Sequence, residues 1–217
     1  MIEIIPAVIP KDFDEIKEKF SKVLGLAKKV QIDIVDGDYA PNRTWPFNPG
    51  QNVTKLLFKD DFILEIDMLV RNPTKYIPDL IKAGARSFVI QIDSCPNLEE
   101  CIDLVKSSGC FVGLGVKPSI GLDLAENLFS KLDFLEFMGN DKVGYSGVEL
   151  DLSVLEKIRE FRSHSDLPIQ IDIGVNFDTA SSLIQAGATG LVSGSAVFTG
   201  DDIEENIKRL QLIDTSL

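Results

Sequence analysis

The feature that most constrains this sequence is a regular alternation of short apolar segments with longer amphipathic ones. Apolar, β-branched segments predict eight strands, over residues 2–9, 30–35, 62–70, 88–92, 111–116, 133–138, 169–173 and 191–193. Helical spacing predicts helices over residues 11–26, 73–83, 97–108, 122–131, 152–161, 178–186 and 203–212, with a short one near 51–58. Because such crossovers join parallel strands, the pattern predicts an α/β fold, a (β/α)8 TIM barrel that occupies residues 1–217 as a single domain.

A short internal sequence repeat supports the barrel. Residues 80–85 read Leu-Ile-Lys-Ala-Gly-Ala and residues 183–188 read Leu-Ile-Gln-Ala-Gly-Ala, and each segment ends a predicted helix with a glycine before the next strand. With 217 residues, 44% of them hydrophobic, the chain is long enough for one large core. The alternative is an open doubly wound sheet, which is less favoured because no glycine-rich dinucleotide-binding turn follows the first strand.

Charge and composition exclude several classes of partner. The net charge of −12 argues against binding to nucleic acid or to anionic membranes, and no apolar segment is long enough to cross a bilayer. The N-terminal segment lacks the basic start of a signal peptide, and Cys95, Cys101 and Cys110 match no zinc pattern. We therefore expect a cytoplasmic protein with reduced, packing cysteines. His164 is the only histidine and lies in a polar stretch, which argues against a histidine base.

Carboxylates interrupt three of the apolar strands. Asp33, Asp67 and Asp172 stand in Ile-Asp-Ile, Ile-Asp-Met and Ile-Asp-Ile, and Gln31 shares a strand face with Asp33. In a barrel of this kind the functional site lies at the carboxyl ends of the strands, where these acids would repel one another. A divalent cation would relieve that repulsion, and oxygen ligands favour Mg²⁺, Mn²⁺ or Ca²⁺ over zinc. The alternative is that some of the acids cap helices or accept backbone hydrogen bonds.

Short glycine-containing loops follow the last three predicted strands. Such loops let backbone N–H groups approach an anion, and phosphate sites in these barrels often use the loops after strands seven and eight. Lys117, after the fifth strand, either stabilises an oxyanion or is a solvated lysine. The candidate anion-binding residues of the loops are Gly144, Ser146, Gly147, Gly174, Gly194 and Ser195.

Several of these motifs together resemble the ribulose-phosphate 3-epimerase family of phosphate-binding barrels, over nearly the whole chain. The strongest match is Ile32-Asp33-Ile34-Val35-Asp36-Gly37 followed by Pro41-Asn42. The others are Arg71-Asn72-Pro73, Lys117-Pro118, Met138 with the loop at 144–147, Asp172 with Gly174, and Ser193-Gly194-Ser195-Ala196-Val197-Phe198.

The resemblance implies a 1,1-proton transfer at C3 of a ketose phosphate. Two aspartates on opposite faces of the substrate, here Asp33 and Asp172, would remove and replace the proton, and a divalent metal would stabilise the enediolate. It also implies that the phosphate lies against the glycine loops, that Met138 and Lys117 belong to the substrate site, that no organic cofactor is needed, and that the protein is a homo-oligomer.

The sequence departs from the family pattern where the metal would bind. Gln31 and Asp67 stand at the positions of two family histidine ligands, and Gln91 stands at that of a third histidine. Either Gln31, Asp33, Asp67 and Asp172 hold a metal through oxygen, or the site binds no metal. The remaining departures are Ala7 for a serine, Val35 for a methionine and Ile173 for a glycine.

Three functional hypotheses follow. The first is an epimerase or close isomerase of a ketopentose phosphate. The second is a related barrel enzyme with another phosphorylated substrate, since the departures from the family pattern gather where the sugar part of the substrate would bind. The third is a non-catalytic binder of phosphosugars. Arg43 and Trp45, in the loop after the second strand, are expected either to contact substrate or to pack in a subunit interface.

Overall fold

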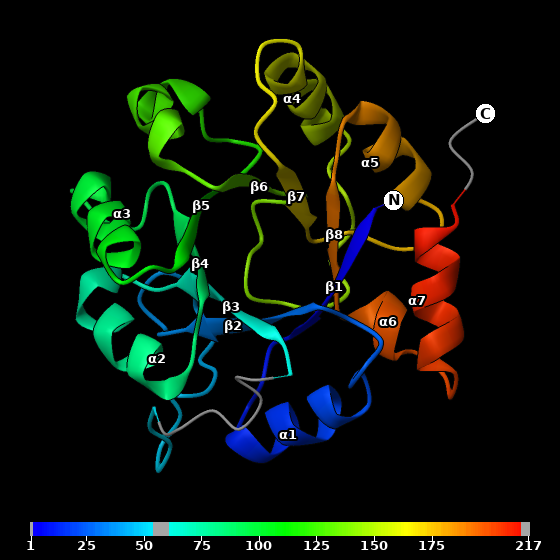
Figure 1. The fold of residues 1–217 in the computed structure, drawn as a ribbon, viewed down its shortest axis with the longest axis horizontal. Coiled ribbons are helices and arrows are strands. Elements are labelled where there is room, and N and C mark those ends of the chain that lie inside the picture. Colours follow the sequence, from blue (N-terminus) through cyan, green and yellow to red (C-terminus); the bar gives the residue numbers. More distant parts are fainter. Residues whose placement is uncertain (1, 54–60, 214–217) are drawn as a thin grey trace.

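The predicted strands form a closed parallel barrel in the computed structural model, which describes residues 2–53 and 61–213 (Figure 1). Each strand pairs with the next along the chain, and the last pairs with the first. The strands are β1 (Glu3–Val8), β2 (Lys29–Val35), β3 (Ile63–Leu69), β4 (Ser87–Gln91), β5 (Phe111–Val116), β6 (Phe134–Met138), β7 (Ile169–Asp172) and β8 (Gly190–Ser193). The predicted fold class is therefore confirmed.

Helices surround the barrel on the outside (Figure 1). Asp12, Asn97 and Asp202 each accept a hydrogen bond from the backbone N–H three residues ahead, which caps the helix that follows. The helices are α1 (Phe13–Ser21), α2 (Ile77–Ala83), α3 (Leu98–Ser107), α4 (Ser153–Arg162), α5 (Ala180–Ala186), α6 (Ser195–Phe198) and α7 (Ile203–Gln211), and the 3₁₀ segments are η1 (Pro73–Lys75), η2 (Leu122–Leu124) and η3 (Glu126–Lys131).

The structure corrects the predicted α-helix at residues 122–131. It consists of the two 3₁₀ segments η2 and η3, which meet at Ala125. Ala125 is completely buried and has φ −137°, so the chain turns there to bury it instead of continuing an α-helix. The helix predicted near 51–58 lies largely outside the described residues. Helix α6 was not predicted, because its four residues are too few to show a helical period.

Trp45 is also placed differently from the expectation. It is completely buried: its backbone N–H donates to the carbonyl of Pro10, and its ring lies 6.1 Å from that of Phe13. It therefore ties the loop after β2 to α1 and is unavailable for contact with a partner chain. Arg43 remains exposed.

The barrel interior is polar, whereas the layer between barrel and helices is apolar. At alternate strand positions, Lys29 donates to Glu65 (3.1 Å) and Gln170 (2.7 Å), and Ser87 donates to Glu65 (2.6 Å). Gln170 donates to Glu65 (2.9 Å) and Glu136 (3.0 Å). Because buried polar groups need partners, this network takes the place of the branched apolar layers usual inside such barrels.

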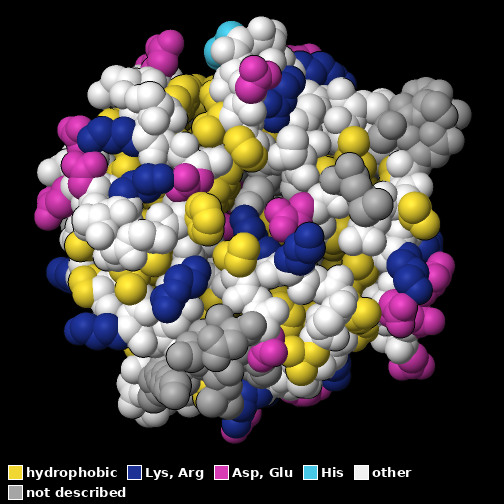
Figure 2. Space-filling model, in the orientation of Figure 1, with side chains coloured by type: hydrophobic (Ala, Val, Ile, Leu, Met, Phe, Trp, Pro, Cys, Tyr) yellow, Lys and Arg dark blue, Asp and Glu magenta, His cyan; other side chains and the backbone are white. Residues whose placement is uncertain are grey.

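The surface carries charges of both signs. Figure 2 shows acidic and basic side chains interspersed on the face viewed, with charged groups around the hollow at its centre. Across the described part of the chain, no helix combines the length and apolar character needed to cross a bilayer.

Candidate functional site

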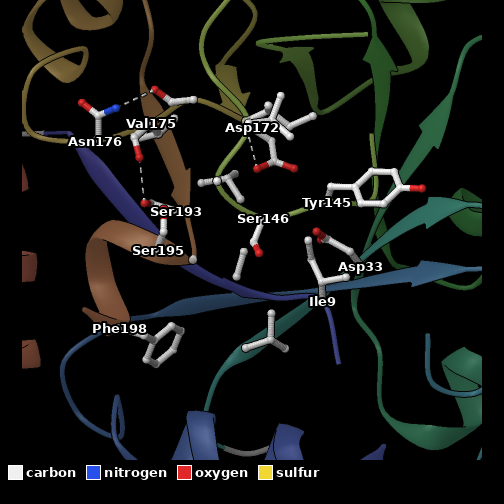
Figure 3. A pocket seen from close by; sticks show the side chains of 18 of the residues that line it. Ile9, Asp33, Tyr145, Ser146, Asp172, Val175, Asn176, Ser193, Ser195 and Phe198 are labelled. Atoms are coloured by element: carbon white, nitrogen blue, oxygen red, sulfur yellow. Dashed lines mark hydrogen bonds between the residues drawn. The ribbon is translucent and has the colours of Figure 1, made fainter. Parts of the chain in front are cut away.

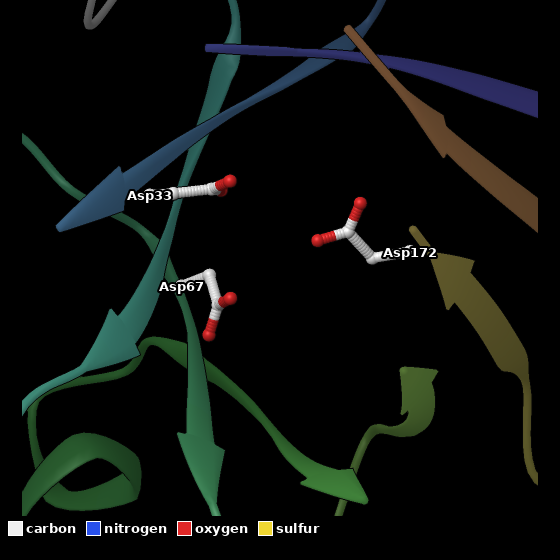
Figure 4. A group of neighbouring side chains, drawn as sticks. All are labelled: Asp33, Asp67 and Asp172. Carbon is white, nitrogen blue, oxygen red and sulfur yellow. The ribbon is translucent and has the colours of Figure 1, made fainter. Parts of the chain in front are cut away.

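Three carboxylates converge inside the barrel (Figure 4). Asp33 of β2 and Asp67 of β3 are paired in register, and Asp172 ends β7 across the barrel. One carboxylate oxygen from each lies within 4.8 Å of the others, and their side chains are 5%, 0% and 9% exposed. The hypothesis that these three acids form one cluster is therefore supported by the geometry.

Each carboxylate accepts a hydrogen bond from a neighbouring residue. Gln31 donates to Asp33 (2.9 Å), Gln91 donates to Asp67 (2.6 Å), and the backbone N–H of Ile173 donates to Asp172 (2.7 Å). Within residues 2–53 and 61–213, three buried oxygens of this cluster and its amide neighbours have no hydrogen-bond partner: Oδ2 of Asp67, Oε1 of Gln31 and Oε1 of Gln91. Unpaired buried acceptors are costly, so they mark where a positive group would be stabilised.

Burial raises the pKa values of all three acids. For Asp33, burial is the main cause, and the charges of Asp172 and Asp67 add to it. For Asp67, burial and the charge of Asp172 raise the pKa well above its usual range. For Asp172, burial raises the pKa to about 6, while hydrogen bonds from Ile173 and Gln31 hold it from rising further. The cluster therefore retains protons when no cation is bound.

The donor set fits a hard divalent cation. Three carboxylates and the amide oxygen of Gln31 supply only oxygen, the preferred ligand of Mg²⁺ and Mn²⁺, whereas zinc favours histidine and cysteine. The single histidine, His164, is exposed in the turn after α4. The unpaired oxygens of Asp67 and Gln31 would be available to such an ion without loss of an existing hydrogen bond.

A cavity of about 440 Å³ opens beside this cluster (Figure 3). Asp33 and Asp172 lie on one side of it, and Ser195 and Phe198 lie toward the other (Figure 3). That volume is in the range of small-ligand sites. Of the residues predicted from the sequence, the structure brings to this lining Asp33, Asp172, Gly144, Ser146, Gly147, Gly174, Gly194 and Ser195.

Glycine is required at Gly174 for two reasons. Its φ is +75°, and a Cβ placed there would lie 2.7 Å from the backbone of Leu150. The chain after β7 therefore lies directly on the long loop that follows β6. This contact holds the two glycine-containing loops side by side along the cavity.

Two predicted substrate-binding residues lie outside the cavity lining. Lys117 donates to Asp93 (2.7 Å) and stands over the ring of Tyr39 at 4.9 Å. Burial would raise the pKa of Asp93, but hydrogen bonds from Lys117 and Tyr39 hold it below its usual value. Met138 is completely buried, with its sulfur 3.9 Å from the amide nitrogen of Gln91. Gln31 and Asp67 lie deeper than the cavity lining.

The structure also brings in residues that the sequence did not point to. Lys19 of α1 lines the cavity and is the only cation among its described lining residues. Its ammonium lies 4.9 Å from the centre of the Phe198 ring, beside α6. In the sequence, Lys19 is one of several lysines on an amphipathic helix, so no local pattern distinguishes it from a solvated residue.

Ile173 adopts an unusual backbone conformation next to Asp172. Its φ is +70°, in the left-handed region that β-branched residues rarely occupy. The side chain packs on an apolar cluster of Val35, Ala40, Leu69, Met138 and Val143. This packing holds a strained backbone at the edge of the cavity.

Comparison with known proteins places these observations in a family. The sequence profile described as the ribulose-phosphate 3 epimerase family matches residues 3–198. The chain is 32% identical to the ribulose-phosphate 3-epimerase of Bacillus subtilis, covering 97% of this chain and 99% of that one. It is 28% identical to the enzyme of the same name from Escherichia coli K12, over 96% and 94% of the two chains.

Solved structures share the architecture at much lower sequence identity. The 3-hexulose-6-phosphate synthase from Salmonella typhimurium has a TM-score of 0.72 at 15% identity, with 96% of each chain covered. A 3-keto-L-gulonate-6-phosphate decarboxylase from Vibrio cholerae has a TM-score of 0.70 at 12% identity, over 97% of this chain and 95% of the other. At these identities the likeness shows the fold alone.

Proposed function

The chain belongs to the ribulose-phosphate 3 epimerase family, and from that premise we propose that it epimerises a ketopentose phosphate at C3, with D-ribulose 5-phosphate as substrate. One observation carries the proposal. Asp33 and Asp172, from strands across the barrel from each other, face the same cavity with both carboxylates nearly buried. Two acid/base groups on opposite sides of one carbon are what inversion by proton transfer requires.

In this proposal the two aspartates have opposite protonation states. Asp172, with a pKa of about 6, is ionised at neutral pH and removes the proton from C3. The electron pair moves onto the adjacent carbonyl oxygen and forms an enediolate. Asp33, whose pKa burial raises well above its usual range, is the proposed proton donor to the other face of C3. The reverse reaction exchanges the two roles.

The whole carboxylate cluster, the two catalytic aspartates included, is proposed to bind a metal ion. We propose that Asp33, Asp67, Asp172 and the amide oxygen of Gln31 hold a divalent cation, Mg²⁺ or Mn²⁺ in preference to Zn²⁺. When bound, the cation would supply electrostatic stabilisation of the negative charge on the substrate oxygens. Gln91 orients Asp67 by its hydrogen bond.

The phosphate is proposed to lie at the far end of the cavity. Gly147, Gly174 and Gly194 expose backbone there, and Ser195 begins α6. Lys19 offsets the negative charge that the aspartates and the acidic protein impose on a phosphorylated substrate.

Proton exchange tests the function directly. D-ribulose 5-phosphate is incubated with the protein in D₂O, with Mg²⁺, Mn²⁺, Zn²⁺ or EDTA, and deuterium at C3 is followed by NMR. We expect metal-dependent wash-in, at least about 100-fold slower in Asp33→Asn and in Asp172→Asn. Absence of wash-in with every metal would rule out this substrate.

A second candidate is a related isomerase with another phosphorylated substrate. Ala7 and Ile173 favour this candidate, because both line the cavity where the sugar part of the substrate would bind and both differ from the family pattern. Wash-in on a ketohexose phosphate but not on ribulose 5-phosphate would select this candidate.

A further inference from the structure

Two of the three cysteines lie in contact, away from the proposed catalytic cavity. Cys95 lies between β4 and α3, and Cys101 lies within α3. Their sulfur atoms are 3.2 Å apart, and both thiols are free. Cys110 belongs to a different site, with its sulfur 3.8 Å from the carbonyl oxygen of Ala85. The sequence alone predicted packing roles for all three cysteines, because a spacing of six positions does not show whether the side chains of Cys95 and Cys101 meet.

The two thiols are exposed to different degrees. Cys101 is completely buried, whereas Cys95 is partly exposed. A small water-soluble oxidant therefore reaches the sulfur of Cys95 first. Cys101 lies behind it, within reach of any product formed on Cys95.

Hydrogen bonding makes Cys95 the nucleophile of the pair. When Cys95 is ionised, the thiol of Cys101 donates to its sulfur, and together with the backbone N–H of Asn97 this hydrogen bond lowers the pKa of Cys95 to about 7 against the opposing effect of burial. The same contact raises the pKa of Cys101. A thiol with a pKa near the ambient pH combines a large thiolate fraction with good nucleophilicity.

The chain holds the two sulfurs together. Asn97 caps α3 by accepting a hydrogen bond from the N–H of Glu100 at 3.2 Å, which fixes the chain between the cysteines. Ahead of Cys95, the N–H of Ser94 donates to the carbonyl of Gln91 (2.9 Å), and Asp93 is paired with Lys117. A disulfide of about 2.05 Å requires the sulfurs to approach by only about 1 Å.

We propose that Cys95 and Cys101 are a reversible oxidation site, which hydrogen peroxide closes into an intramolecular disulfide. The Cys95 thiolate attacks one peroxide oxygen, the O–O bond breaks, and the departing hydroxide takes up a proton to become water. The resulting sulfenic acid is attacked by the sulfur of Cys101. An S–S bond forms, and the second oxygen leaves as water with the Cys101 proton. Two thiols lose two electrons, and one peroxide becomes two waters.

The test uses the full-length reduced protein and needs no substrate, so its outcome is independent of the proposed epimerase activity. After treatment with hydrogen peroxide, free thiols are counted in denaturant and the intact mass is measured. Of the three thiols, we expect one to remain, with a mass loss of about 2 Da and a peptide that links Cys95 to Cys101. Dithiothreitol should restore all three.

Variants in which one cysteine is replaced by serine distinguish the thiol that peroxide attacks from the thiol that completes the disulfide. Cys101→Ser should accumulate an oxygen adduct on Cys95 and form no link, and Cys95→Ser should leave Cys101 unmodified. Cys110→Ser is the matched control and should form the link at the wild-type rate. The proposal is wrong if the wild-type protein keeps all three thiols, carries an oxygen adduct on Cys95 without the link, or forms links that involve Cys110 or a second chain.

Discussion

Individual residues of the site differ in how the protein stabilises their charge. Asp172 accepts a backbone hydrogen bond, whereas Asp67 accepts one from Gln91 and has a second oxygen without a partner in the described structure. In the proposed metal site, Asp67 and Gln31 offer a carboxylate and an amide oxygen where the resemblance implies histidine ligands. The balance between the acids is therefore set by the number of donors around each one.

The proposed role of Lys19 in binding the substrate phosphate can be tested by substitution. Lys19→Gln should raise the KM for a phosphorylated substrate about three- to tenfold and leave kcat unchanged, because the phosphate charge is the same in the ground and transition states. Steady-state kinetics at two ionic strengths would measure this. Lys22→Gln is the control, since Lys22, the C-cap residue of α1, is not among the residues that line the cavity and pairs with Glu18 at 2.7 Å. Equal effects of both variants would contradict a specific role for Lys19.

Ile173 permits a second prediction. Replacing this residue by glycine removes the backbone strain of φ +70°, which costs about 1–3 kcal/mol of stability. The same substitution destabilises the protein by removing a partly buried side chain and by making the unfolded backbone more flexible. We expect Ile173→Gly to change the free energy of unfolding by less than about 1 kcal/mol in urea titrations, unlike other apolar truncations. Ile173→Val, which keeps the strain, is the comparison. A loss above about 2 kcal/mol in the glycine variant would show that the left-handed conformation carries little strain.

Among the strands, β5 makes room for the side chains of its neighbours. Gly113 faces the ring of Phe134, and Gly115 faces the amide of Gln91. A Cβ at Gly115 would lie 2.4 Å from the Gln91 nitrogen, the atom that donates to Asp67. The glycine thus allows Gln91 to reach across from β4 and orient the carboxylate.

This arrangement predicts a coupling between the two positions. Gly115→Ala should displace Gln91, lower stability by about 1–3 kcal/mol and weaken Mn²⁺ binding measured by calorimetry. In a Gln91→Ala background, where the clash is gone, the same substitution should cost much less stability. A double-mutant cycle in urea measures the coupling. Additive costs would mean that Gly115 is not required for the position of Gln91.

Across the whole molecule, the barrel interior concentrates negative charge. Asp33, Glu65, Asp67, Glu136 and Asp172 are buried there, and Lys29 is the one cation in that network among the described residues. Burial also raises the pKa of Glu136, and the charges of Asp67 and Asp172 add to the shift. Such a cluster stabilises a bound cation and costs stability when no cation is bound.

The stability of the metal-free protein should therefore depend on pH. The folded state binds protons more tightly than the unfolded chain, so the free energy of unfolding falls as pH rises, for Asp172 between its usual 3.8 and about 6. Burial also raises the pKa values of Asp33, Asp67 and Glu136, so these acids add to the fall as pH rises above their usual pKa values. In EDTA, we expect the Tm to fall by several degrees between about pH 4 and about pH 6.

Mn²⁺ should remove most of this dependence, because the bound ion stabilises the ionised acids. Asp67→Asn, which deletes one raised acid, should flatten the EDTA profile and weaken Mn²⁺ binding. Thermal unfolding followed by circular dichroism measures both effects. A Tm that rises with pH in EDTA would show that the buried acids are stabilised as carboxylates by the protein itself.

The fold and the candidate site residues could both be predicted from the sequence. The strand and helix periods predicted the barrel, because side-chain periodicity and burial are local properties of each segment. Acids within apolar strands and glycines after later strands predicted a candidate site, since all carboxyl ends of the strands open on one face. Asp33, Asp172 and the glycine loops were therefore predictable one segment at a time.

Which of these residues lie in contact depends on the tertiary structure. In the tertiary structure Lys19 lines the cavity, Lys117 pairs with Asp93 outside it, and Trp45 is buried against Phe13 of α1. The tertiary structure also sets the sulfurs of Cys95 and Cys101 in contact. These outcomes depend on side-chain directions and on contacts between segments distant in sequence. Periodicity places a residue on a face of its own strand or helix but does not say which residue lies opposite.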